Sequence, residues 1–142
     1  MIKEFQGKYR FLSNFYPVFI EYDGKTYPSV EHAYQAAKTL DLKERDKIRQ
    51  ATTPGQAKKL ARSITLREDW DDIKYYIMVL LINKKFQLDP LKAMLLTTGN
   101  EELQEGNMWG DIYWGIDLRS GVGENNLGKI LMMVRGRYNK TT

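Results

Sequence analysis

The chain has 142 residues and a formal net charge of +4, and it contains no cysteine and a single histidine. This composition excludes disulfide scaffolds, thiol catalysis, zinc fingers and histidine-rich metal centres, although carboxylates alone can still bind Mg²⁺ or Ca²⁺. An apolar fraction of 42% and an aromatic fraction of 12% indicate a folded protein, expected to be one domain over residues 1–142. No apolar run approaches the ~20 residues of a membrane span, and no signal peptide is evident, so a cytoplasmic protein without membrane contact is expected.

The N-terminal part of the chain is predicted to be extended and to contain one β-hairpin. Val18–Tyr22 and Lys25–Tyr27 are the two strands, and Asp23-Gly24 between them favours the positive φ angles of a tight turn.

Just before this hairpin, the polar residues Ser13 and Asn14 lie among aromatic side chains such as Phe15, where the chain is expected to turn. Buried polar side chains need hydrogen-bond partners, and a ligand can supply one.

The rest of the chain is predicted to be helical, so the expected fold class is mainly α (α+β). Helical spacing and capping signals, including Thr53-Pro54 and Asp89-Pro90, predict helices over residues 29–40, 42–51, 54–63, 67–86, 90–99 and 126–138. A long irregular stretch, 105–124, precedes the last helix, and loops of this length are often functional.

The first predicted helix carries an unusual polar stripe. At about 100° per residue, Glu31, Gln35 and Lys38 share one side, beside His32 and the aromatic Tyr34. This set of side chains is typical of a binding or catalytic site. The alternative is an ordinary solvated face, because an acid in the first turn and a later lysine suit any exposed helix.

The irregular stretch contains a second concentration of functional groups. Residues 105–117 combine three acids, two tryptophans, a tyrosine and three glycines. Aromatic rings offer flat faces for a base or a sugar, and acids can donate or accept protons. At least one of Trp109 and Trp114 is expected to be a core anchor instead.

Basic residues are concentrated in residues 43–62 and again near the C-terminus, at Arg135, Arg137 and Lys140. Such an excess suits a phosphate-bearing ligand or nucleic acid, whereas ordinary solvated helix faces would also explain it. No DNA-binding motif accompanies this basic excess, so a nucleic-acid-binding helical module is the least favoured interpretation of the chain.

Five motifs follow one another along nearly the whole chain. They are FLSNFYP at 11–17, YPSVEHAYQAAK at 27–38, DW at 69–70, GDIYWG at 110–115 and NLGKILM at 126–132. In these motifs and in their order, the sequence resembles the YbiA-like family, also called NADAR for its association with NAD and ADP-ribose metabolism.

The resemblance implies a compact, mainly helical fold and N-glycosidase activity without a cofactor or metal. It implies Glu31, Lys38 and Asp111 as catalytic residues. The residues expected to bind substrate are Ser13, Asn14, Phe15, His32, Gln35, Trp70, Tyr113, Trp114 and Asn126.

Cleavage of a ribose–nitrogen bond suits these residue types. Positive charge develops on the sugar in the transition state, and a carboxylate can stabilise it while an acid assists the departing nitrogen. Glu31 and Asp111 are candidates for these roles. Lys38 is either a charge partner or a nucleophile that forms an imine with the opened ribose.

The expected substrate is ADP-ribose linked to a guanine base, either free or within nucleic acid. The alternatives are ribosylaminopyrimidine phosphate intermediates of riboflavin biosynthesis, and a non-catalytic module that binds ADP-ribose without turnover.

Overall fold

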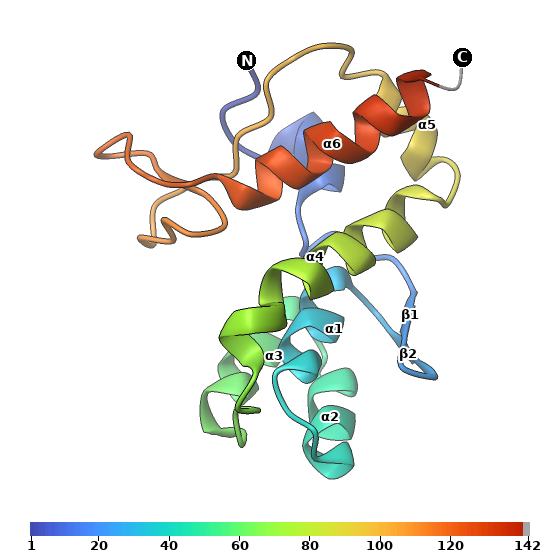
Figure 1. Cartoon of the computed structure of the whole chain (residues 1–142), viewed down its shortest axis with the longest axis vertical. Helices are drawn as coiled ribbons and strands as arrows, with labels where there is room; N and C mark the ends of the chain where they lie inside the picture. The colour runs from blue at the N-terminus through green and yellow to red at the C-terminus, as the bar shows by residue number, and fades with distance from the viewer. Residues whose placement is uncertain (141–142) are drawn as a thin grey trace. The chain divides into compact units, whose positions relative to one another are not determined.

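The computed structural model describes residues 1–140, half of which lie in helices. Figure 1 shows the path of the chain through these helices. They group into two units with dense internal contacts. The central unit comprises residues 14–85, and the terminal unit comprises residues 1–13 together with the segment from residue 86 onward. The expectation of one domain over residues 1–142 stays a prediction, and its last two residues lie outside the described part.

The central unit contains one β-hairpin and four α-helices. Its elements are β1 (Ile20–Tyr22), β2 (Lys25–Tyr27), α1 (Val30–Ala37), α2 (Leu42–Arg49), α3 (Pro54–Leu60), the 3₁₀ helix η2 (Ala61–Ser63) and α4 (Trp70–Phe86), whose last residue belongs to the terminal unit. Every residue of α1 is buried, and α2 and α3 both pack against it. Small residues such as Ala33 and Ala36 are fully buried, which lets neighbouring elements approach α1 closely.

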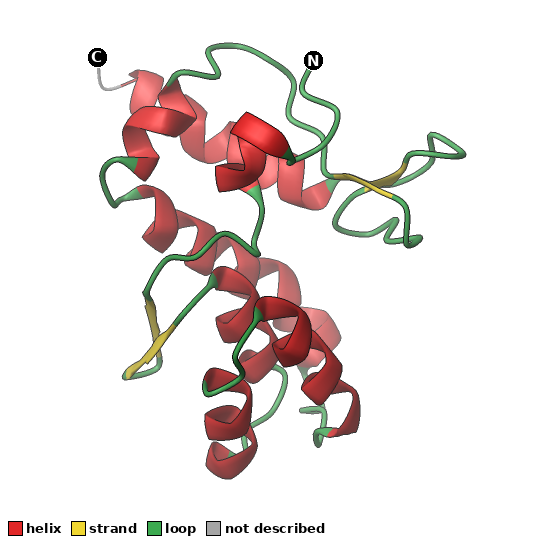
Figure 2. Ribbon diagram, turned by 180° about the vertical axis from the view of Figure 1, so that it is seen from behind, coloured by secondary structure: helices red, strands yellow, loops and turns green. Residues whose placement is uncertain are grey.

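The hairpin prediction is confirmed, although the first strand begins at Ile20 and not at Val18. The two strands of the hairpin are drawn in yellow in Figure 2. β1 and β2 pair antiparallel with Ile20 opposite Tyr27, and Asp23 and Gly24 have φ angles of 50° and 83°. Two consecutive positive φ angles match the right-handed twist of the strands. The turn is fixed to α2, because the guanidinium of Arg45 donates to the Asp23 carboxylate at 2.7 Å.

Local capping sets where the helices of the central unit begin. The Ser29 hydroxyl accepts from the backbone N–H of His32 at 3.1 Å, and the Asp41 carboxylate caps α2. Thr53 caps α3 as predicted, with Pro54 in the first turn.

Helix α4 shows how burial differs from the simple pattern of apolar residues. Its buried side includes Met78, Leu81 and Ile82, whereas Leu80 is exposed. Leu80 lies about 200° around the helix from Met78, so both cannot face the same core. Lys85 is fully buried, and its Nζ lies 5.7 Å from the centre of the Tyr16 ring.

The terminal unit is built from segments at both ends of the chain. Its elements are the 3₁₀ helix η1 (Gly7–Leu12), α5 (Leu91–Leu96), the short parallel strands β3 (Gly106–Asn107) and β4 (Ile116–Asp117), and α6 (Asn126–Lys140). The prediction of extended structure is wrong for η1. The consecutive residues Phe11 and Leu12 are both buried there, and this does not fit the alternation of a strand.

The fifth predicted helix is shorter than expected. The Asp89–Pro90 peptide bond is cis, and α5 begins after it at Leu91. Gly99, predicted as the helix end, has a φ of 60° just beyond the last turn. No helix within residues 1–140 has the length and apolar character needed to cross a membrane.

Candidate active site

Two polar side chains of α1 are buried together. Glu31 is 8% exposed and Gln35 is 4% exposed, one turn further along the helix. The Gln35 Nε2 donates to the Glu31 Oε2 at 2.6 Å. The backbone N–H of Glu31 donates to the carbonyl of Asn14 at 3.1 Å. The solvated-face reading of this stripe is therefore wrong for Glu31 and Gln35.

Two buried acceptors lie on the residues that contact Glu31. Within residues 1–140, the Gln35 Oε1 and the Asn14 Oδ1 have no hydrogen-bond partner. An ionised carboxylate only accepts hydrogen bonds, so Gln35 must present its NH₂ group to Glu31 and leave its oxygen available. The surroundings of Glu31 thus have acceptor capacity that suits a ligand rich in hydroxyl groups.

Lys38 lies at the C-terminal end of α1, half-buried beside the Tyr34 ring. Its Nζ is 5.5 Å from the centre of the Tyr34 ring. The Trp70 ring packs at 5.2 Å on Tyr34, and Trp70 is only 5% exposed. The aromatic pair therefore supports one side of the lysine.

Burial lowers the pKa of Lys38 below its ordinary value. The carboxylate of Glu31 opposes this effect, while the positive charges of Lys58 and Lys74 add to it. A lysine in such surroundings gives up its proton more readily, as an amine nucleophile requires.

His32 makes hydrogen bonds within the protein through both ring nitrogens. Its Nε2 lies 3.0 Å from the carbonyl of Ala51 and its Nδ1 lies 2.7 Å from the Ser29 hydroxyl. The Nε2 must donate to the carbonyl, so Nδ1 accepts from Ser29 in the neutral ring. This geometry joins the start of α1 to the segment after α2.

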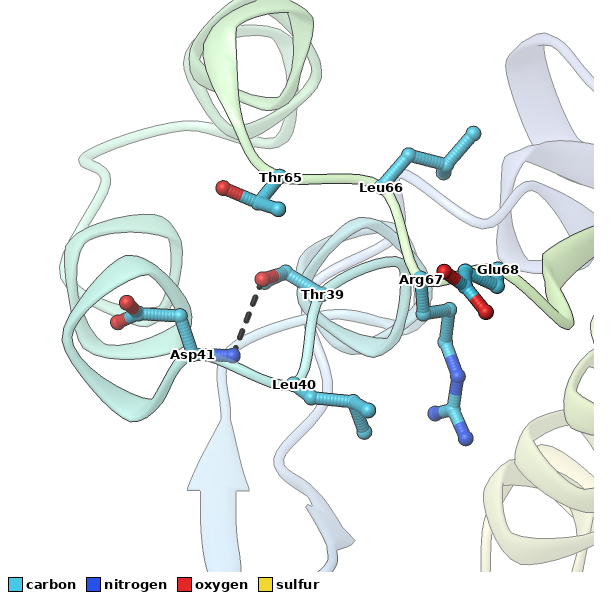
Figure 3. A pocket seen from close by; sticks show the side chains of 7 residues that line it. All are labelled: Thr39, Leu40, Asp41, Thr65, Leu66, Arg67 and Glu68. Atoms are coloured by element: carbon cyan, nitrogen blue, oxygen red, sulfur yellow. Dashed lines mark hydrogen bonds between the residues drawn. The ribbon is translucent and has the colours of Figure 1, made fainter.

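An open pocket of about 330 Å³ lies beyond the C-terminal end of α1 (Figure 3). It is lined by Thr39, Leu40, Asp41, Thr65, Leu66, Arg67 and Glu68, and none of the predicted site residues is among them. The backbone N–H of Arg67 donates to the carbonyl of Lys38 at 2.8 Å. The Glu44 carboxylate accepts from Thr39 and Thr65, so this segment fixes the backbone beneath Lys38.

In the terminal unit, Asp111 organises the irregular loop. Its Oδ1 accepts from the backbone N–H groups of Tyr113 at 3.1 Å and Trp114 at 2.9 Å. Asn107, only 1% exposed, binds the Asp111 backbone twice, at 3.0 Å through Oδ1 and at 2.9 Å through Nδ2.

The loop is also joined to the start of α6. The Asn126 Nδ2 donates to the carbonyl of Tyr113 at 2.9 Å, and the Tyr113 and Trp114 rings meet edge to face at 4.7 Å. Asn125, with a φ of 53°, bonds the backbone of Leu103 and Glu105. The structural roles of Asn107 and Asn125 were not predicted. The available signal was the frequency of polar side chains in this glycine-rich loop.

Glycine is required where the loop crosses itself. A Cβ on Gly115 would overlap the carbonyl and carboxylate oxygens of Glu105. The expectation of a core tryptophan is wrong: Trp109 is 61% exposed, and Trp114 is only half-buried. The buried positions of this loop are occupied by Asn107 and Gly115 instead.

The predicted site residues thus form two groups. Asn14, Glu31, Gln35, Lys38 and Trp70 come together in the central unit, where His32 supports α1 and Phe15 is half-buried. Asp111, Tyr113, Trp114 and Asn126 come together in the terminal unit, where Ser13 is half-buried at the end of η1.

Comparisons with known families, proteins and structures all relate this chain to the same group of proteins. The NADAR domain matches residues 2–139. N-glycosidase YbiA of Escherichia coli is 41% identical over 126 residues, covering 87% of this chain and 78% of the relative. A riboflavin biosynthesis protein of Vibrio vulnificus is 44% identical over 128 residues, covering 88% of this chain but only 34% of the relative, so the chain spans about a third of that protein.

The chain belongs to the NADAR family. The NMR structure of E. coli YbiA has a TM-score of 0.85 and 37% identity to this chain, covering 99% of this chain and 86% of the other. The predicted family and the mainly helical fold with its N-terminal hairpin are therefore confirmed, and the relatives named N-glycosidase support the prediction of an enzyme.

Proposed function

We propose that this NADAR protein is an N-glycosidase that hydrolyses the bond between a ribose C1′ and a nitrogen, with guanine-linked ADP-ribose as its substrate. The observation that carries the proposal is the buried carboxylate of Glu31, close enough to Lys38 to act on its charge and bordered by acceptors without partners.

In this reaction the C1′–N bond breaks and its electron pair stays on the nitrogen. Positive charge develops on the ribose, and the Glu31 carboxylate stabilises it or removes a proton from the attacking water. The departing nitrogen takes up a proton, for which Asp111 is the candidate donor. The water oxygen ends on C1′.

The two roles for Lys38 lead to different products on the protein. As a charge partner it interacts with Glu31 or a phosphate. As a nucleophile its neutral amine attacks C1′ of the ring-opened N-glycoside, the C1′–N bond to the base breaks with its electron pair on the nitrogen, which takes up a proton, and water then hydrolyses the imine to the ribose aldehyde and the free lysine. Borohydride would reduce such an imine to a stable secondary amine, so a ribose adduct on Lys38, found by peptide mass spectrometry and lost in Lys38→Arg, would assign the nucleophilic role.

The substrate is tested by incubating the full chain with ADP-ribosylated guanosine and measuring released guanosine by chromatography. We expect release by the wild type and little release by Glu31→Gln. Binding of ADP-ribose without any release would instead support a non-catalytic reader.

The riboflavin intermediates are the second candidate. The Vibrio vulnificus relative carries a riboflavin biosynthesis name, and both substrate classes share a ribose N-glycoside and phosphate. A higher kcat/KM on ribosylaminopyrimidine phosphate than on ADP-ribosylated guanosine would favour this alternative.

A further inference from the structure

The side-chain amide of Gln35 has one paired group and one unpaired group. Its Nε2 donates to the Glu31 Oε2 at 2.6 Å, a short and buried contact. Its Oε1 is shielded from solvent and has no hydrogen-bond partner within residues 1–140. A buried acceptor without a partner destabilises a folded protein. The described part of the chain therefore bears this cost without using the oxygen itself.

The contact with Glu31 determines where this oxygen lies. The nitrogen and the oxygen belong to one planar amide, so the oxygen is held beside the atom that contacts the carboxylate. Asn14 also has a buried oxygen without a partner, but its Nδ2 contacts the sulfur of Met78 at 3.5 Å. Of these two amides, Gln35 is the one that joins an unpaired acceptor directly to the carboxylate of Glu31.

The chemistry of ribose indicates which substrate atom this oxygen would meet. In the proposed reaction the Glu31 carboxylate acts at C1′, where positive charge develops. The neighbouring acceptor requires a hydrogen-bond donor close to C1′. The ring oxygen bonded to C1′ cannot donate, whereas the hydroxyl group on the adjacent C2′ can. A substrate that reaches Gln35 displaces the side chains that cover the oxygen, and the hydrogen bond gained offsets part of that cost.

We propose that Gln35 accepts a hydrogen bond from the 2′-hydroxyl of the substrate, so that the site selects ribosyl over 2′-deoxyribosyl N-glycosides. This inference rests on the proposed function, since it names the sugar that the same site accepts. One amide holds the carboxylate and recognises the neighbouring hydroxyl, which orients C1′ towards Glu31. A substrate without the 2′-hydroxyl leaves the buried oxygen unpaired and is therefore disfavoured.

The test measures the binding of three ligands to the full chain by calorimetry. They are ADP-ribose and two analogues that lack the hydroxyl on C2 or on C3 of the ribose with the free anomeric carbon. We expect the wild type to bind ADP-ribose about tenfold more tightly than the 2-deoxy analogue, because one hydrogen bond is lost. In Gln35→Met, folded by circular dichroism, the two affinities should agree within about twofold. The 3-deoxy analogue is the matched control, and its affinity relative to ADP-ribose should be the same in both proteins.

A second variant separates the loss of the oxygen from the loss of the contact with Glu31. Glu31→Leu with Gln35→Met replaces both partners and leaves no buried carboxylate without its donor. It should also bind ADP-ribose and the 2-deoxy analogue equally. The inference is overturned if either variant keeps the preference for the 2-hydroxyl, if the wild type shows no such preference, or if ADP-ribose does not bind the wild type.

Release of guanosine from ADP-ribosylated guanosine is measured separately. A preference for the 2-hydroxyl that depends on Gln35, without release of guanosine, would refute the proposed reaction and keep the inference. Release of guanosine by a wild type that binds ADP-ribose and the 2-deoxy analogue equally would do the reverse.

Discussion

Helix α1 and the loop of residues 105–125 carry similar acids and amides but use them differently. In the loop, the polar groups of Asn107 and Asn125 and the Oδ1 of Asp111 bond to backbone and hold the loop's shape. In α1 the side chains of Glu31 and Gln35 bond each other and not the backbone, and Gln35 keeps acceptor capacity. We infer that the helix leaves its polar side chains available for chemistry, whereas the loop uses most of its own to hold its shape.

The largest expected effect on turnover comes from a change in α1. Glu31→Gln should reduce turnover about a thousandfold, because it removes the charge that faces the cationic sugar. The amide oxygen can still accept from Gln35, so the melting temperature should stay near that of the wild type. Turnover close to wild type in this folded variant would exclude Glu31 as the catalytic carboxylate.

Two variants of Asp111 separate chemistry from shape in the loop. Asp111→Asn keeps an oxygen that can accept from Tyr113 and Trp114, so its stability should be retained, while turnover should fall about a hundredfold if Asp111 is the proton donor. Asp111→Ala should lose turnover and also about 1 kcal/mol of stability. Full activity in Asp111→Asn would make Asp111 a purely structural residue.

The loop prediction is tested most directly at Asn107. Asn107→Ala removes a buried amide with three backbone contacts and leaves their partners unsatisfied, so it should lower the free energy of unfolding by about 2 kcal/mol. Urea denaturation measures this change. Asn100→Ala, at an exposed position nearby in the chain, is the control and should have no effect.

The smallest expected effect comes from His32. Like the asparagines of the loop, this residue of α1 uses its polar side-chain atoms to hold the structure together. Burial lowers the pKa of His32, so the folded chain disfavours the charged ring. In the unfolded chain the histidine takes up a proton near pH 6.5. The stability that comes from keeping His32 neutral is therefore complete above that pH, and it is lost as the pH falls towards the lower pKa of the folded state. Melting temperatures measured between pH 7.5 and 5 should fall with the pH, and this fall should be smaller in His32→Gln. An unchanged pH dependence in His32→Gln would contradict this assignment.

Local signals in the sequence were enough to predict much of the central unit. The Asp23-Gly24 turn and the Thr53-Pro54 cap depend on residues adjacent in the chain, and the pairing of Glu31 with Gln35 follows from the four-residue spacing of a helix. These features could be predicted because neighbours in sequence determine them.

Features that depend on distant residues could not be predicted. Asn125 bonds the carbonyl of Leu103, 22 positions away, and the Trp70 ring of α4 packs on the Tyr34 ring of α1. Helix η1 was missed because its two buried residues are consecutive and have no periodic pattern. The catalytic and substrate-binding roles themselves stay predictions.

The unpaired oxygen of Gln35 implies that thermal stability and ligand affinity place opposite demands on this site. A buried acceptor without a partner lowers the stability of the empty protein by about 1–3 kcal/mol. Gln35→Met removes this oxygen together with the donor to the buried Glu31 carboxylate, so the single variant should be less stable than the wild type. Replacement of both partners, by Glu31→Leu with Gln35→Met, should raise the melting temperature and abolish turnover. Selection for heat resistance alone would therefore remove the pair, and selection for turnover would retain it.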